Sequence, residues 1–483
     1  MARVYFDIVL ATGDCLMRRV LRFLLGAALM ILGFLFVWAG GSLVEAIRDS
    51  SLGGPEPAAQ SWRWHRALTP AFEKWARARR SNDAAKHLSL NNISGTEWPL
   101  FGAVYYLRAT ENLDQAWQRS PRGEQPSKYA RRAIDAAADL LADPAQADWV
   151  VRHWGKSDYI KKENVFYRML LIDGLASQWS LLGSTPHADL LREQVTGLAT
   201  ELAESANGLL ADYPQQTFPA DVAAAWHAIR RADKFLGTDH DEMAKTAIRG
   251  FVGTMAPDGE LPPYAWFGDP IVATPVRGSA NAWLLHHAPF LWPDAARLWF
   301  SAHNRRFWQP SGWLAGYREY DQLDQPWFEM DVDSGPVVGG LGTSASAFGI
   351  GATRSMGDTR KARKLSLQAI AASWPLPNGR LLVPMLLSDS LNAPLLGEAA
   401  MLYNLSQPVA TGLVLTEEPE SLSDVPYAVW TVLLLQIVFG IAMILRGAKS
   451  MNHVVRSRAQ TTRTPTIRSP RSPDCRIRRR LGW

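Results

Sequence analysis

The sequence predicts an all-α protein, an (α/α)6 toroid of six helical hairpins flanked by two transmembrane helices. Three observations predict this fold class. Charged and apolar helical patterns alternate six times through the middle of the chain. An uncharged apolar run lies near each end. Between Trp62 and Leu415 the pattern of alternating residues and hairpin turns that marks strands is not evident.

The first element is an uncharged run over residues 23–44, preceded by Arg18, Arg19 and Arg22. It is long enough to cross a bilayer core of about 30 Å. The preceding arginines place residues 1–22 in the cytoplasm, because basic residues concentrate on that side. A cleaved signal peptide is the alternative, since the small residues 39–41 suit a signal peptidase.

The last apolar element, residues 425–445, precedes a basic tail over residues 446–483. The tail holds eleven Lys and Arg against Asp474, so it carries about +10 and leaves about −5 for the rest of the chain. This distribution favours anionic membrane lipid, and no nucleic acid, as the partner of the tail. The composition of the tail is typical of disorder. With both termini cytoplasmic, the domain of residues 60–415 is predicted to be extracytoplasmic or periplasmic, anchored in the cell membrane.

The two cysteines, Cys15 and Cys475, both fall on the predicted cytoplasmic side. We therefore expect the domain to fold without disulfides, which a core of roughly 360 residues permits. Neither HExxH nor CxxC occurs, and the adjacent His286 and His287 cannot face one ion from a helix. We predict no metal and no cofactor.

Each predicted hairpin pairs a charged helix with a following buried helix, and the buried helices would form the inner ring. In chain order the pairs are residues 71–80 with 97–110, 127–142 with 163–182, 187–207 with 218–237, 239–255 with 279–291, 293–307 with 334–356, and 358–373 with 396–404.

The connections from outer to inner helices are long and rich in Gly, Pro and aromatic residues, as over residues 256–278, 308–333 and 374–394. Long irregular loops in a compact domain are usually functional. In a toroid all of them gather at one mouth, where the inner helices begin. This mouth is therefore the predicted site.

Polar side chains cluster at these helix starts, with Glu97 opening the first inner helix and Asp212 and Tyr213 preceding the third. Carboxylates and tyrosines in an enclosed pocket suit general acid and base chemistry, because burial raises a carboxyl pKa towards neutrality. The predicted catalytic residues are Asp221, Asp333, Asp331, Tyr167 and Glu163. For Asp221 and Asp333, a role as helix cap or first-turn charge is an equally good interpretation.

The predicted substrate-binding residues are Tyr264, Arg168, Arg277, Trp313 and Trp327. The two arginines either hold an anionic substrate or pair with nearby carboxylates, and the sequence favours pairing. The loop tryptophans serve either as a platform for a sugar or terpene or as wedges that pin the loop.

Several segments together resemble the linalool dehydratase/isomerase family. They are Trp154-Gly155, Lys162-Glu163-Asn164-x-x-Tyr167, Leu182-Gly183, residues 218–224, residues 236–239, Asp331-Val332-Asp333-Ser334-Gly335 and residues 356–358. The resemblance covers roughly residues 150–370. It implies an (α/α)6 domain with its pocket at the mouth. The characterised family enzyme uses two cysteines and a histidine, where this chain has Ala211, Ala220 and Leu170. The resemblance therefore does not imply linalool as substrate.

Two classes of function follow. One is an enzyme, either an acid–base lyase or isomerase or a cell-envelope glycan hydrolase or lyase. The other is a non-catalytic envelope protein that binds a glycan or a lipid. The sequence favours a membrane-anchored acid–base enzyme of the lyase or isomerase type with an unidentified substrate.

Overall fold

The computed structural model describes residues 2–155, 157–205, 207–253, 260–268, 272–310, 312–321, 326–331, 334–413 and 424–461. Over these residues the chain is mostly helical with a few short strands, which confirms the prediction of a mainly helical protein. It divides into two compact units. One combines Met1–Val37 with Gln436–Trp483, and the other is Trp38–Leu435.

The terminal unit is built from two long helices, α1 (Ala2–Arg48) and α18 (Tyr427–Thr461). Each contains a stretch long and apolar enough to cross a membrane, Val20–Arg48 and Tyr427–His453. Only 11% and 17% of these stretches are buried, so they are unlike core helices. The predicted tail starts inside α18, which continues to Thr461, and residues 462–483 lie outside the described part.

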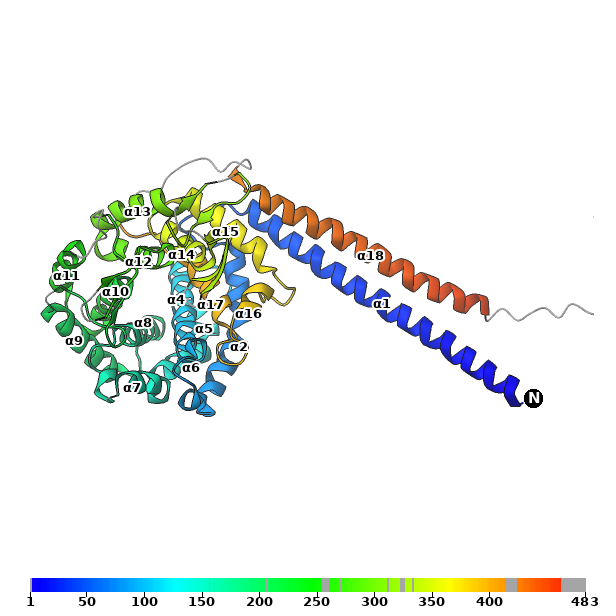
Figure 1. The fold of residues 1–483 in the computed structure, drawn as a ribbon, viewed down its shortest axis with the longest axis horizontal. Coiled ribbons are helices and arrows are strands. Elements are labelled where there is room, and N and C mark those ends of the chain that lie inside the picture. Colours follow the sequence, from blue (N-terminus) through cyan, green and yellow to red (C-terminus); the bar gives the residue numbers. More distant parts are fainter. Residues whose placement is uncertain are drawn as a thin grey trace, which may run out of the picture. The chain divides into compact units, whose positions relative to one another are not determined.

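Glycines allow α1 and α18 to pack closely within this unit, where the two helices run side by side (Figure 1). A Cβ added to Gly33 would lie 2.6 Å from the carbonyl oxygen of Gly440, and one added to Gly447 would lie 2.5 Å from that of Gly26. The glycines recur seven residues apart on each helix, so they fall on one face. Small residues at such a seam are typical of helix pairs in membranes.

In the larger unit a helix lies at the place of each member of the six predicted pairs. The first, more exposed members are α2 (Ala59–Ser81), α6 (Arg131–Ala142), α9 (Ala188–Glu204), α11 (Asp241–Gly253), α13 (Pro293–Phe307) and α15 (Thr359–Ser373). The second, buried members are α4 (Trp98–Arg119), α8 (Val165–Leu182), α10 (Pro219–Leu236), α12 (Gly278–Leu291), α14 (Thr343–Ser355) and α17 (Leu396–Ser406).

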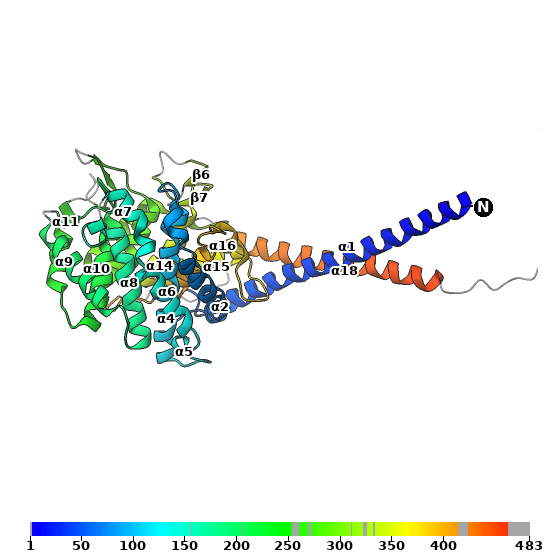
Figure 2. The ribbon, with the colours of Figure 1, turned by 90° about the horizontal axis from the view of Figure 1, so that it is seen from below.

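The six buried helices contact one another in chain order, and α17 returns to contact α4. Figure 1 shows them around the middle of the unit, with α9, α11 and α13 outside them. The core lies between the two sets of helices. Short helices α3 (Ile93–Thr96), α5 (Pro126–Tyr129), α7 (Asp148–Trp154) and α16 (Leu382–Leu387) lie in the connections. Figure 2 places α7 and the strands β6 and β7 towards one end of the buried helices and α5 at the other.

Local signals fix the ends of the buried helices. Asn164 caps α8 by accepting a hydrogen bond from the Tyr167 amide at 3.3 Å, and Gly183 ends the helix at a φ of 76°. Pro219 opens α10, and Gly237 ends it at a φ of 68°. These ends agree with the predicted hairpins to within a few residues.

Three small antiparallel sheets interrupt the long loops, and the sequence pattern did not predict them. Their strands are β1 (Gln216–Thr217), β2 (Trp266–Phe267) and β3 (Val272–Ala273), β4 (Trp308–Gln309) and β5 (Gly316–Tyr317), and β6 (Phe328–Asp331), β7 (Gly335–Val338) and β8 (Leu341–Gly342). Strands of two to four residues are too short for an alternating pattern to register. The fifth buried helix was predicted to begin at Ser334, but it begins at Thr343. Strands β7 and β8 occupy most of the residues in between, and they are too short to be seen in the sequence pattern.

Candidate functional site

A cavity of about 1060 Å³ opens at the end of the unit where the six buried helices begin. Each of these helices contributes residues from its first turns or its N-terminal flank, which agrees with the predicted mouth. The contributions are Glu97, Trp98 and Phe101 at α4, Phe166 at α8, Ala220 and Asp221 at α10, Ser279, Ala280 and Trp283 at α12, Thr343–Phe348 in part at α14, and Leu396, Gly397 and Ala400 at α17.

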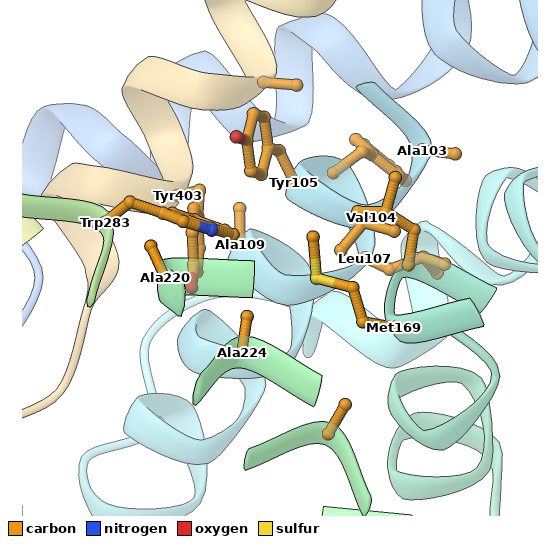
Figure 3. Packing of buried hydrophobic residues seen from close by; sticks show 14 of the residues in the cluster. Ala103, Val104, Tyr105, Leu107, Ala109, Met169, Ala220, Ala224, Trp283 and Tyr403 are labelled. Carbon is orange, nitrogen blue, oxygen red and sulfur yellow. The ribbon is translucent and has the colours of Figure 1, made fainter. Parts of the chain in front are cut away.

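Aromatic side chains form the floor of this cavity. Tyr105 stacks on Tyr403 with ring centroids 5.3 Å apart, and the Trp283 ring lies 6.1 Å from Tyr105 and 5.2 Å from Phe348. Figure 3 shows Tyr105, Trp283 and Tyr403 grouped beside Ala220. Such a surface suits an apolar ligand.

Asp221 brings a carboxylate to this apolar surface from the first turn of α10. Its Oδ1 accepts a hydrogen bond from the indole Nε1 of Trp283 at 2.9 Å. The helix N-terminus and this donor both stabilise the charged form of the carboxyl group. Asp221 is thus held towards the floor of the cavity.

Glu97 adds a second carboxylate at the start of α4 and pairs with Tyr213, whose hydroxyl donates to Glu97 Oε1 at 2.7 Å. Burial raises the pKa of Tyr213 well above its usual value, and Glu97, Asp212 and Asp221 raise it further. The phenol therefore bonds to one carboxyl group and is subject to the charges of two more. They come from three different places in the chain.

Asp212 is fully buried behind this group, and its Oδ2 accepts a hydrogen bond from the Phe218 amide at 2.7 Å. Burial, followed by the charge of Asp221, raises its pKa well above the usual value for aspartate. Two nearby carboxyl groups cannot both ionise easily in a buried place, so one of them retains a proton. Asp212 is therefore the member of the pair that keeps its proton more readily.

A second wall of the cavity contains Ser279, Tyr264 and the groups behind them. Ser279 Oγ donates to Glu319 Oε1 at 2.6 Å, and Arg277 contacts the same carboxylate at 2.9 Å. The Arg277 guanidinium also lies 4.6 Å from the centre of the Tyr264 ring. Burial raises the pKa of Glu319 to about 7, against the opposing effect of Arg277.

Below the aromatic floor the buried helices hold a set of ion pairs that the sequence analysis did not predict. Arg231 of α10 pairs with Glu111 of α4 and Asp173 of α8, and Arg108 Nη1 donates to Glu111 at 3.0 Å. All four side chains are buried. Beside them, His227 Nδ1 and His287 Nδ1 lie 3.0 Å apart. This set closes the ring below the cavity, so we regard it as structural.

Two of the predicted site residues, Asp221 and Tyr264, line the cavity. Asp331 does not line it. Its Oδ2 accepts a hydrogen bond from Arg277 at 2.7 Å, so the predicted pairing of Arg277 is present. Asp333 lies outside the described residues.

Glu163, Tyr167 and Arg168 lie at the start of α8, where they contact α9, and they do not line the cavity. Glu163 and Asn164 both have positive φ, 49° and 47°. Arg168 Nη1 donates to the Glu163 carbonyl at 3.1 Å and to Glu201 Oε1 at 2.9 Å, and the Glu163 amide donates to Glu201 Oε2 at 2.7 Å. The segment Lys162–Tyr167 thus forms a tight turn that Arg168 and Glu201 hold in place.

Trp313 and Trp327, which were predicted as possible platforms for a ligand, do not line the cavity. Trp313 and Trp327 are both exposed. Trp313 follows Gly312 in a segment that bonds to the start of α18, and the Trp327 carbonyl accepts from the Gly339 amide at 2.9 Å in the β6–β7 hairpin. Both contacts are made by the backbone, so the indole side chains serve neither as platforms in the cavity nor as packed wedges.

Among the described residues, no group of three or more His, Cys, Asp or Glu side chains is placed to hold a metal ion. The resemblance compares Ala211, Ala220 and Leu170 with the two cysteines and the histidine of the family enzyme. Of these three residues, only Ala220 lines the cavity. No protein-family model matches the chain, and no significant match to a curated protein is found. The resemblance to the linalool dehydratase/isomerase family stays a prediction.

Proposed function

We propose that the protein is a membrane-anchored acid–base enzyme of the lyase or isomerase type, with a largely apolar substrate. The observation that carries this proposal is the placement of Glu97 and Asp221 in a cavity whose lining is mainly apolar and aromatic. The closed ring of six buried helices, each preceded by a more exposed one, supports an (α/α)6 toroid as its scaffold. The two apolar helices α1 and α18 would cross the membrane, with the cavity on the extracytoplasmic side.

The chemistry requires one carboxyl group as an acid and another as a base. In a dehydration, the acid gives its proton to a hydroxyl oxygen, and the C–O bond breaks to release water. The base removes a proton from the adjacent carbon, and its electron pair forms the C=C bond. Asp221 and Glu97 would take these two roles, with Asp212 as the proton-retaining neighbour of Asp221 and Tyr213 as the donor that orients Glu97.

An apolar substrate fits the lining better than a glycan does. A sugar needs many hydrogen-bonding groups, whereas alkyl and aromatic side chains such as Phe101, Phe166, Leu396 and Met401 dominate this surface. The exposed positions of Trp313 and Trp327 also weaken the interpretation of these residues as sugar platforms.

Proton exchange tests the proposal and does not require the product to be identified first. The full-length protein in detergent would be incubated in D2O with a panel of long-chain and isoprenoid alcohols and alkenes, and deuterium uptake and loss or gain of water would be measured by mass spectrometry. We expect uptake with one class of substrate and a loss of about 10²–10⁴-fold in rate for Asp221→Asn and for Glu97→Gln.

Asp294→Asn is the matched control, because Asp294 also lies in the first turn of a helix that proline opens but is exposed on α13. It should retain the wild-type rate. Equal rates for Asp221→Asn, Glu97→Gln and this control would show that the two carboxylates are structural.

A further inference from the structure

The cavity continues beyond the ring to α15 and α16. Five residues of α15 line it, namely Leu365, Gln368, Ala369, Ala372 and Ser373, together with Val383, Pro384 and Leu387 of α16. An enclosed site for a small molecule does not need this extension. A long chain could occupy it.

The other face of α15 holds the ends of both apolar helices. Arg363 donates to the carbonyl oxygens of Ile47 at 2.6 Å and Asp49 at 2.8 Å, at the end of α1. Arg360 pairs with Asp424 at 2.8 Å, three residues before α18. Helix α15 therefore lies between the extended cavity and two chain segments, the end of α1 and the residues just before α18, which adjoin the predicted membrane helices.

A short segment links the same two places directly. The amides of Tyr427 and Ala428 donate to the carbonyls of Gly312 and Trp313, both at 2.9 Å. Leu314, the next residue, lines the cavity, and the Ala315 amide donates to Gln368 of α15 at 2.8 Å. The cavity wall thus continues into the first turn of α18.

Exposed aromatic residues surround this junction. Tyr427 and Trp430 at the start of α18 and Trp313 all have exposed side chains, and so does Trp38, ten residues before the end of α1. Trp and Tyr are enriched at the interface between bilayer and water. Their position indicates that the bilayer surface lies at this part of the larger unit.

The outer edge of the extended cavity is apolar and exposed. Leu314, Val338 and Leu387 all line the cavity, although their side chains are 37%, 56% and 53% exposed. Leu386 and Leu391, close to Leu387 in the chain, are exposed as well, and so are Trp327, Phe328 and Met330 at β6, the strand that pairs with the strand of Val338. We call these eight residues the apolar rim. So many exposed large apolar side chains at the edge of one cavity are uncommon on a protein that contacts only water.

We propose that the apolar rim contacts the bilayer, and that a membrane lipid with a long apolar chain passes from the bilayer past the rim into the cavity. The choice of the bilayer as partner follows from the position of the rim beside the ends of two apolar helices. The inference rests on the proposed function only for what happens to the lipid afterwards. Contact and passage are binding events that can be tested without turnover.

Site-specific fluorescence tests the contact. The chain has two cysteines, so Cys15→Ser and Cys475→Ser give a background for single cysteines. Leu387→Cys and Val338→Cys would carry an environment-sensitive fluorophore, and Leu298→Cys, exposed on α13, is the control. In proteoliposomes with nitroxide-labelled phosphatidylcholine, both rim positions should lose fluorescence and the control should not. Equal quenching at all three sites would overturn the proposed contact. Cross-links between two copies at the rim, without quenching, would also overturn it and would assign this surface to a second copy of the chain.

Photo-cross-linking tests the passage. A phosphatidylcholine with a diazirine in its acyl chain should label the cavity segment around Met401 in the full-length protein. Ala369→Trp would fill the extension from α15, so it should abolish this labelling and leave quenching at Leu387 unchanged. Labelling confined to α1 and α18 would overturn the passage. The two proposals can fail separately. If the rim is quenched and Met401 is labelled, this inference holds. If the Asp221→Asn variant nevertheless exchanges protons at the wild-type rate, the proposed function is refuted.

Discussion

At the scale of single residues, the buried ion pairs below the cavity make stability depend on acidity. Although burial opposes its ionisation, Arg231 and Arg108 lower the pKa of Glu111 from 4.5 to about 2. A lowered carboxyl pKa stabilises the fold above the unfolded-state value, and this stability is lost as the pH falls from about 4.5 towards 2. The difference in pKa corresponds to roughly 3 kcal/mol.

We therefore predict that Glu111→Gln lowers the melting temperature strongly at pH 7, because breaking a buried pair costs about 3–5 kcal/mol. The loss should shrink as the pH falls below about 4.5 towards 3, since the carboxyl group of the unfolded wild-type chain then takes up a proton while that of the folded chain stays ionised. Thermal melts in detergent at pH 7, 5 and 3 measure this. Glu124→Gln, in the exposed pair with Arg66, is the control and should change little. A constant difference between Glu111→Gln and wild type at every pH would contradict the pairing.

A second prediction concerns Gly351, where α14 and α12 approach closely. A Cβ at this position would lie 1.9 Å from Cε1 of His286, whose Nε2 contacts both the Phe348 carbonyl oxygen at 2.9 Å and Asn404 Oδ1 at 3.0 Å. Gly351→Ala should cost about 1–3 kcal/mol by overpacking. Adding His286→Ala should recover part of this loss, as a double-mutant cycle of melting temperatures would report. Gly102→Ala, whose nearest contact would lie 3.8 Å away, should be neutral or stabilising.

At the scale of elements, the turn before α8 gives a prediction that separates backbone strain from chemistry. Asn164 adopts a φ of 47° and caps the helix. Asn164→Gly should be almost neutral, because glycine accepts this φ and caps nearly as well. Asn164→Ala should cost about 1–3 kcal/mol, since it loses the cap and takes a strained backbone. Urea unfolding of the two variants compares them. Similar stability for both would mean that the turn is not strained.

The helices of the fold could be predicted from the sequence because each one carries a complete local signal. The buried run of α8 lies between Asn164 and Gly183, and that of α10 between Pro219 and Gly237. The hydrophobic periodicity of a helix and the residues that mark its ends lie within one short stretch of the chain. Both can therefore be recognised in a single sequence. The short strands have no such signal.

The candidate site could be predicted only in part. The helix starts located the mouth, and Asp221 and Tyr264 do line it. Glu97 and Tyr213 were visible at helix starts, but their pairing joins residues 116 positions apart and has no sequence signature. The Lys162–Tyr167 motif pointed to the mouth, yet its polar groups hold a turn against α9. Polar residues near a helix start thus serve either the turn or the cavity, and only the direction of each side chain decides which.

At the scale of the whole molecule, the arginines beside the two apolar helices predict that both chain ends lie in the cytoplasm. The two native cysteines, Cys15 and Cys475, report this directly, because each lies near one end. In cells with a permeabilised outer layer, a membrane-impermeant maleimide should label neither cysteine until the inner membrane is lysed. Single Cys→Ser variants assign each signal. Labelling of both before lysis would reverse the orientation, and labelling of Cys475 alone would mean that only one of α1 and α18 crosses the membrane.

The same orientation predicts where a protease cuts. Residues 417–424 connect the helical ring to α18, so protease added outside such cells should cleave there and leave the basic tail intact. The tail carries about +10, and the negative surface of the cytoplasmic leaflet attracts such a segment. A tail-specific antibody should detect a membrane-bound fragment of α18 and the tail. Loss of the tail epitope with an intact ring would place the ring in the cytoplasm, and the cavity would then face cytoplasmic and not extracytoplasmic substrates.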